Sequence, residues 1–72
     1  MKSIILNKGK AKPFWHGHPL VFSGAIAKAD SEISPGELVQ VHDDQNRLIG
    51  VGIFNPHSSY RVRILARASW NI

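Results

Sequence analysis

The residues that could do chemistry in this chain are few, and the histidines come first. His16 and His18 are two residues apart, so on an extended chain they share a face. A zinc site would need further ligands, and neither His42 nor His57 has a motif spacing with this pair. We therefore predict no metal site. His16 is expected at a helix end, where it can bond free carbonyls, and His18 in the loop before Pro19.

Nucleophilic and phosphate-cradling sites are not predicted either. Ser23 before Gly24 lacks the flanking glycine pattern of a nucleophile elbow. The "GVG" at 50–52 lies inside an expected strand with no helix behind it, so it is not a phosphate loop. Asp43 and Asp44 are adjacent in an apparent turn and are expected to point apart. We expect no catalytic residue and no cofactor site, so this chain is not predicted to be an enzyme by itself.

The cationic side chains are better candidates, for binding rather than catalysis. Nine Lys and Arg against five Asp and Glu give a net charge of +4 and a pI near 10, which favours polyanionic partners. A lysine cluster precedes Phe14 and Trp15, of which at least one is expected in the core, and two arginines alternate on one strand face. Lysine attracts phosphate, and arginine can also stack on bases. The alternative is a merely solvated basic surface. The five cationic side chains that are candidates for binding are Lys8, Lys10, Lys12, Arg61 and Arg63.

Length and composition restrict the class of protein further. A chain of 72 residues allows one domain, expected over 1–72, with a small core. It has no cysteine, which excludes disulfides and thiolate zinc sites and fits a cytoplasmic location. The longest apolar run, at 20–22, is too short to span a membrane or to act as a signal sequence, so no membrane partner is expected.

The elements that would position these residues are short strands and one short helix. The helix is expected through Pro13 to His16, because Pro13 suits only a first turn and Gly17 suits the left-handed stop. Gly24 predicts a bend or bulge inside one strand. The pattern favours a compact barrel of about five strands. The predicted strands are 3–6, 21–29, 38–42, 47–55 and 60–66.

The strand predicted over 47–55 carries two glycines at alternate positions. Ile49, Val51 and Ile53 are expected to share one face, with Gly50 and Gly52 on the other. Two glycines on one face allow another backbone to approach closely.

Two stretches, "GHPLVFSGAIAKAD" and "PGELVQVHDDQNRLIGVGIFNPHSSYRVRIL", carry an ordered set of motifs over nearly the whole chain. This set resembles the amino-terminal PUA domain of a family of S-adenosylmethionine-dependent enzymes, the ribosomal RNA large-subunit methyltransferase I-like family, which makes 5-methylcytosine in 23S rRNA. This chain departs from the family in two places. Leu20 stands where the family usually has Trp, and the family's helix is usually richer in Arg and Leu than "KPFW", residues 12–15 of this chain. The matching residues are Gly17, His18, Pro19, Phe22, Ser23, Gly24, Pro35, Gly36, Gly50, Asn55, Pro56, His57, Ser58, Arg61 and Arg63.

The resemblance implies a mainly β (α+β) fold, a small PUA-like pseudo-barrel that binds structured RNA, in particular rRNA. It also implies an N-terminal fragment of a longer methyltransferase, whose absent downstream domain would bind S-adenosylmethionine and pack on this one. PUA domains generally present the helix and second strand to RNA. The expected RNA-binding residues are Lys8, Lys10, Lys12, His16, Gly17, His18, Ser23, Arg61 and Arg63.

The alternative is a non-catalytic scaffold that packs on its own catalytic domain or forms a homodimer. In that case the exposed face of Phe14, Trp15 or Trp70 would be the contact.

Overall fold

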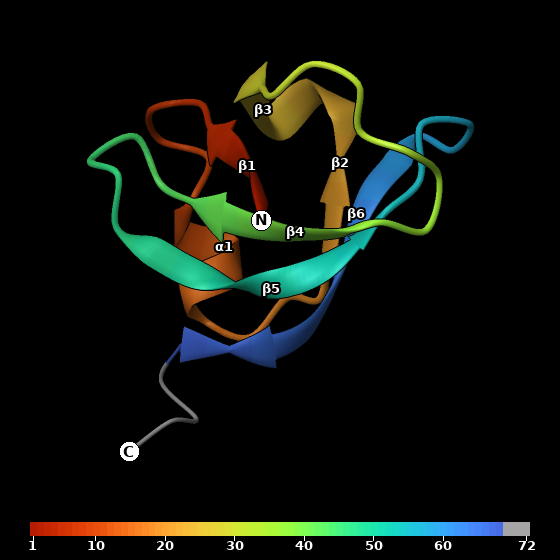
Figure 1. The fold of residues 1–72 in the computed structure, drawn as a ribbon. Helices are drawn as coiled ribbons and strands as arrows, with labels where there is room; N and C mark the ends of the chain where they lie inside the picture. The colour runs from red at the N-terminus through yellow and green to blue at the C-terminus, as the bar shows by residue number, and fades with distance from the viewer. Residues whose placement is uncertain (69–72) are drawn as a thin grey trace.

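The computed structural model describes residues 1–68 and arranges them as one six-stranded sheet that curls around the core (Figure 1). The strand order is β2-β6-β5-β4-β1-β3. The β1–β4 pair is parallel, and the other pairs are antiparallel. The expected mainly β fold with one short helix is therefore confirmed. The elements are β1 (Lys2–Leu6), α1 (Lys12–Trp15), β2 (Leu20–Phe22), the 3-10 turn η1 (Ser23–Ala25), β3 (Ile26–Ala29), β4 (Leu38–His42), β5 (Leu48–Phe54) and β6 (Tyr60–Arg67).

The number of strands is six rather than about five, because the strand predicted over 21–29 is two strands. The 3-10 turn η1 separates them, and they lie at opposite ends of the sheet order, β2 beside β6 and β3 beside β1. The Ser23 amide donates to the carbonyl of Ser59 at 2.7 Å, while the Asn7 amide donates to the carbonyl of Ala25 at 2.8 Å. The bend expected at Gly24 therefore carries the chain from one edge of the sheet to the other.

The core is built from inward-facing aliphatic side chains of the strands and one aromatic ring from α1. Phe14 is only 2% exposed, whereas its neighbour Trp15 is 44% exposed. One member of this pair is therefore a core residue, as the sequence predicts. The other fully buried aliphatic side chains are Ile4, Leu6, Val21, Val39, Val41, Ile49 and Val62.

The two glycines of β5 lie against β6. A Cβ atom added to Gly50 would lie 2.5 Å from the carbonyl oxygen of Ala66, and one added to Gly52 would lie 2.3 Å from that of Arg63. The predicted close approach of another backbone is therefore confirmed. The expectation that Ile49 shares a face with Ile53 is wrong, since Ile49 is buried and Ile53 is 37% exposed. The β4–β5 register skips Ile49, and such a bulge turns the side chain to the other face.

Asp43 fixes the turn between β4 and β5. Its carboxylate is 1% exposed, and its Oδ1 accepts hydrogen bonds from the amides of Gln45 at 2.9 Å and Arg47 at 2.8 Å. Its Oδ2 accepts one from the Arg47 guanidinium at 2.8 Å. Burial acts to raise the pKa of Asp43, but the hydrogen bonds from Arg47 and Gln45 outweigh it and hold the pKa below its ordinary value. Asp43 is therefore a turn residue, as the sequence predicts.

No helix within residues 1–68 is long and apolar enough to cross a membrane.

Candidate nucleic-acid interface

The helix α1 is a single turn, Lys12–Trp15, which begins and ends one residue before the predicted range Pro13 to His16. Pro13 lies in its first turn, where its missing amide hydrogen removes no hydrogen bond. The His16 amide donates to the carbonyls of Lys12 at 3.2 Å and Pro13 at 3.1 Å, and the Gly17 amide donates to that of Phe14 at 3.3 Å. Gly17 has a φ of 107°, a conformation that side-chain-bearing residues rarely adopt. His16 therefore caps the helix through its backbone, and its imidazole is exposed.

The loop that follows α1 is fixed by His18. The His18 amide donates to the carbonyl of Pro13 at 3.0 Å, and its Nδ1 accepts the Leu20 amide at 3.3 Å. Its ring meets the Phe14 ring edge to face, with centroids 5.7 Å apart. His18 thus links the loop both to the helix and to the core, and it lies in the loop before Pro19, as expected.

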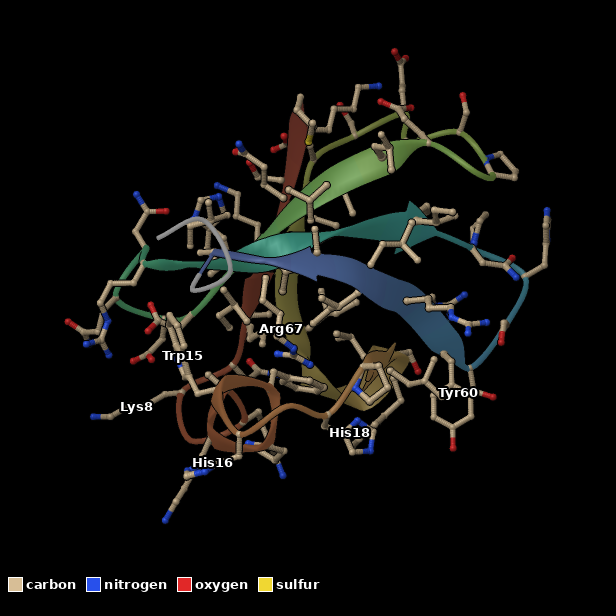
Figure 2. All side chains as sticks on the ribbon, turned by 90° about the horizontal axis from the view of Figure 1, so that it is seen from below. Lys8, Trp15, His16, His18, Tyr60 and Arg67 are labelled. Atoms are coloured by element: carbon tan, nitrogen blue, oxygen red, sulfur yellow. The ribbon has the colours of Figure 1, made fainter. Side chains whose placement is uncertain are left out.

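Arg67, a residue that the sequence did not indicate, also holds this loop. Its Nη1 donates to the carbonyl of Phe14, and its Nη2 donates to the carbonyl of His18 at 2.8 Å. Figure 2 shows the Arg67 side chain pointing from the sheet toward the α1 segment. The partners are 53 and 49 residues away in sequence, so no local motif could have identified this contact.

A hollow of about 330 Å³ lies between the loop before α1, the helix and η1. Phe22, which is 46% exposed, forms part of its wall, and the Phe22 ring lies over the backbone of Gly24. One lining residue, Lys10, is a candidate cation, and a second, His18, belongs to the fixed loop. The hollow therefore combines an apolar wall with a cation. Its lining residues are Gly9, Lys10, Pro13, Phe14, His18, Phe22 and Ala25.

Two of the predicted site residues, Lys10 and His18, line this hollow, and most of the others belong to the same stretch of chain. The α1 segment, defined as residues 8–18, carries six of the predicted site residues, and all six are exposed. Figure 2 shows Lys8, His16 and His18 along the same side of the molecule. Ser23, also exposed, begins η1 and directly follows the lining residue Phe22 in sequence. The six residues on the α1 segment are Lys8, Lys10, Lys12, His16, Gly17 and His18.

The two predicted arginines lie apart from the α1 segment, on β6. Arg61 is half-buried, and its Nη1 donates to the carbonyl of Pro56 in the β5–β6 turn. Arg63 is exposed on the outer face of the sheet, where it is paired across strands with Leu20 and Ile53. The structure therefore gives these two guanidinium groups different surroundings, although they lie on one strand.

The charged side chains of the α1 segment are all basic, since residues 8–18 contain no Asp or Glu. No Asp or Glu occurs before Asp30. Within the described residues the ion pairs are Lys2–Glu37 at 3.9 Å and Arg47–Asp43 at 2.8 Å, and neither involves a lysine of the segment. In the same part of the chain, no group of three or more His, Cys, Asp or Glu side chains could hold a metal ion. The chemistry that this surface offers is therefore attraction of anions.

Comparison with known proteins agrees with the motifs. Among curated relatives are the ribosomal RNA large subunit methyltransferase I of Salmonella arizonae, 34% identical over 61 residues, and that of Erwinia tasmaniensis, 38% identical over 61 residues. Each match takes in 85% of this chain but only 15% of the relative, so the chain spans a small part of these proteins. The resemblance to this methyltransferase family is confirmed.

Solved structures share the fold. NSun6 from Pyrococcus horikoshii, solved with SFG, gives a TM-score of 0.81 at 23% identity over 93% of this chain and 19% of that chain. An H/ACA RNP bound to a substrate RNA containing 2'-deoxyuridine gives a TM-score of 0.79 at 17% identity over 93% of this chain and 23% of that chain. The family model described as a PUA-like domain matches residues 4–67. With its curled sheet, single short helix and this match along nearly its whole length, the chain belongs to the PUA-like domain family.

Proposed function

We propose that this chain is an RNA-binding module whose contact surface is the α1 segment together with Ser23. The observation that carries the proposal is the set of three exposed lysines, without ion pairs among the described residues, beside a partly apolar hollow. Lysine ammonium groups bind phosphates as point charges, and the resulting affinity falls with salt because counterions are released. A rigid, shaped surface next to such charges suits structured RNA, which proteins recognise largely by shape.

We further propose that the RNA is ribosomal and that the module docks it for an S-adenosylmethionine-dependent methyltransferase domain of the 5-methylcytosine type. The names of the curated relatives support this, as does the small share of their length that the chain spans. The cofactor would belong to that other domain, and this chain would contribute RNA contacts only. A cytoplasmic location would follow from a ribosomal RNA partner.

The test is a titration of a fluorescent RNA stem–loop at several salt concentrations. Each phosphate contact contributes about 0.7 to 0.9 to the slope of log K against log salt. The variant with Lys8→Gln, Lys10→Gln and Lys12→Gln should therefore give a slope shallower by about 2 to 3. Lys28→Gln is the matched control, because Lys28 is exposed on β3, outside the segment. An unchanged slope in the triple variant would contradict the assigned surface.

The second candidate function is packing against another protein domain. It is favoured by apolar side chains that are exposed on the outer face of the sheet. Leu38, Ile53 and Leu65 are 47%, 37% and 46% exposed there, close to Arg63. Exposed apolar groups that lie together mark contact sites. Of the contacts expected for a scaffold, Phe14 is buried, Trp15 is exposed, and Trp70 lies outside the described residues.

The occupant that we propose for this outer face is the methyltransferase domain of a longer protein. Linkage in one polypeptide raises the effective concentration enough for a small face to suffice. Calorimetric titration of the separately produced methyltransferase domain should show association with this chain that Leu65→Lys abolishes. Sedimentation of the chain alone tests the homodimer, the other form of the scaffold. Concentration-dependent dimerisation that Leu65→Lys removes would assign the face to a second copy.

A further inference from the structure

Arg67 connects the end of the sheet to the α1 segment. It is the last residue of β6, and its guanidinium donates to the carbonyl oxygens of Phe14 and His18, the latter at 2.8 Å. These carbonyls stand at the end of the helix and in the loop after it. One side chain therefore links both to the sheet, and Figure 2 shows the Arg67 side chain reaching from β6 toward α1.

The α1 segment depends on contacts of this kind with the rest of the fold. A helix of four residues is too short to be stable alone, and its side-chain anchors in the protein are few. Phe14 buries its ring, and the ring of His18 packs against it. The N-cap residue, Ala11, makes no side-chain hydrogen bond to the helix. The hydrogen bonds from Arg67 are charge-assisted, which makes them stronger than bonds between neutral groups.

Arg67 is poorly placed to contact RNA itself. Arg67 is half-buried, and two of its five N–H donors bond backbone carbonyls. Moving the guanidinium out to a phosphate would break these charge-assisted hydrogen bonds and leave the two carbonyls without that partner. An effect of Arg67 on RNA binding would therefore pass through the α1 segment.

We propose that Arg67 is the positioning residue of the RNA interface: it holds the α1 segment in the conformation that binds RNA, without touching the RNA. Because RNA binding is itself the proposed function, the affinity arm of the test rests on that proposal. If loss of Arg67 lowers the fraction of molecules in the binding conformation to a tenth, the apparent Kd rises about tenfold.

Two variants separate positioning from charge. Arg67→Met removes the hydrogen bonds and the charge. Arg67→Lys keeps the charge but lacks the planar fork of donors that serves two carbonyls at once. Both should weaken binding of a fluorescent RNA stem–loop, Arg67→Met by about tenfold, with an unchanged salt slope. Lys12→Gln is the comparison, because loss of a phosphate contact should make the slope shallower by about 0.7 to 0.9.

A double-mutant cycle shows whether Arg67 and Lys12 act independently. If Arg67 sets only the fraction of chains in the binding conformation, Arg67→Met should weaken binding by the same factor in the wild type and in the Lys12→Gln background. A general loss of folding would give the same factors, so a measurement on the free chain has to separate the two. Amide hydrogen exchange of the free chain is the readout independent of RNA. Exchange at Gly17 and His18 should become faster in Arg67→Met, while core strand amides such as that of Val39 keep their protection.

The outcomes separate this inference from the proposed function. A wild-type chain that binds no RNA would refute the proposed function and the role of Arg67 in it. Wild-type binding with an unchanged Kd in Arg67→Met would overturn the Arg67 inference alone. A salt slope that becomes shallower in Arg67→Met would also overturn it, because Arg67 would then be a phosphate contact.

Discussion

The buried carboxylate of Asp43 is expected to be a large contributor to the stability of this domain. Asp43→Ala removes three hydrogen bonds, two from backbone amides and one from the Arg47 guanidinium. Hydrogen bonds to a charged group contribute about 1.5 to 3 kcal/mol each when buried. The Arg47 side chain is 70% exposed, so solvent reduces the ion-pair contribution to less than about 1 kcal/mol. Because Gln45 and Arg47 are exposed, their amides can bond water in the variant, so the net loss is smaller than the sum of these contributions. We expect Asp43→Ala to lower the free energy of unfolding by about 2 to 4 kcal/mol.

Asp43→Asn is a milder substitution at the same position. The amide oxygen can still accept from the backbone amides of Gln45 and Arg47, but the amide nitrogen then faces the Arg47 guanidinium, donor against donor. A loss of about 1 to 2 kcal/mol is expected. A domain of this size has a total stability of only about 4 to 11 kcal/mol, so both losses are measurable.

The pH dependence of stability follows from the lowered pKa of Asp43. Burial opposes ionisation of this carboxyl, but the hydrogen bonds from Arg47 and Gln45 prevail, so its pKa is lower in the folded chain than in the unfolded one. A group of this kind contributes stability above its unfolded pKa, about 3.9, and loses it as the pH falls through the folded value. Below about pH 4, the wild type should therefore lose more stability than Asp43→Asn does.

Urea unfolding followed by circular dichroism measures both effects at pH 7 and pH 3. The expected order of midpoints at pH 7 is wild type, then Asp43→Asn, then Asp43→Ala, with a smaller spread at pH 3. Asp44→Asn is the control, because Asp44 is exposed in the same turn. Equal midpoints for wild type and Asp43→Asn at pH 7, or an equal loss in both on acidification, would refute the reasoning.

Two further predictions concern the core and the close contact between β5 and β6. Gly52→Ala should destabilise the chain by more than about 2 kcal/mol, because its Cβ would lie 2.3 Å from the Arg63 carbonyl oxygen. Gly24→Ala is the matched control: its Cβ would meet the Phe22 ring at 3.4 Å, an ordinary contact, so urea midpoints should differ clearly between the two variants. Phe14→Ala should lower the free energy of unfolding by about 3 to 5 kcal/mol, visible as a lower urea midpoint. A Phe14→Ala chain that is as stable as wild type would contradict the placement of that ring in the core.

The sequence by itself determined the local structure and the family. The strand predicted over 38–42 is β4, Leu38–His42, and the helix ends before Gly17, whose φ is 107°. Gly36, which follows Pro35 in the connection between β3 and β4, has a φ of 82°. These features depend on the conformational preferences of single residues and their neighbours, which a sequence states directly. The ordered motifs along the chain were also sufficient to identify the family.

The tertiary structure decided which of these elements meet. No local signal shows that residues on either side of Gly24 belong to opposite ends of one sheet, because strand pairing depends on partners far along the chain. The choice between Phe14 and Trp15 as the core residue depends on which side of α1 faces the sheet. Arg67 reaches carbonyls 53 and 49 residues away, and only the tertiary structure brings them within hydrogen-bond distance. The chain's residues supplied the charges for the proposed interface, and the packing of distant segments determined their arrangement.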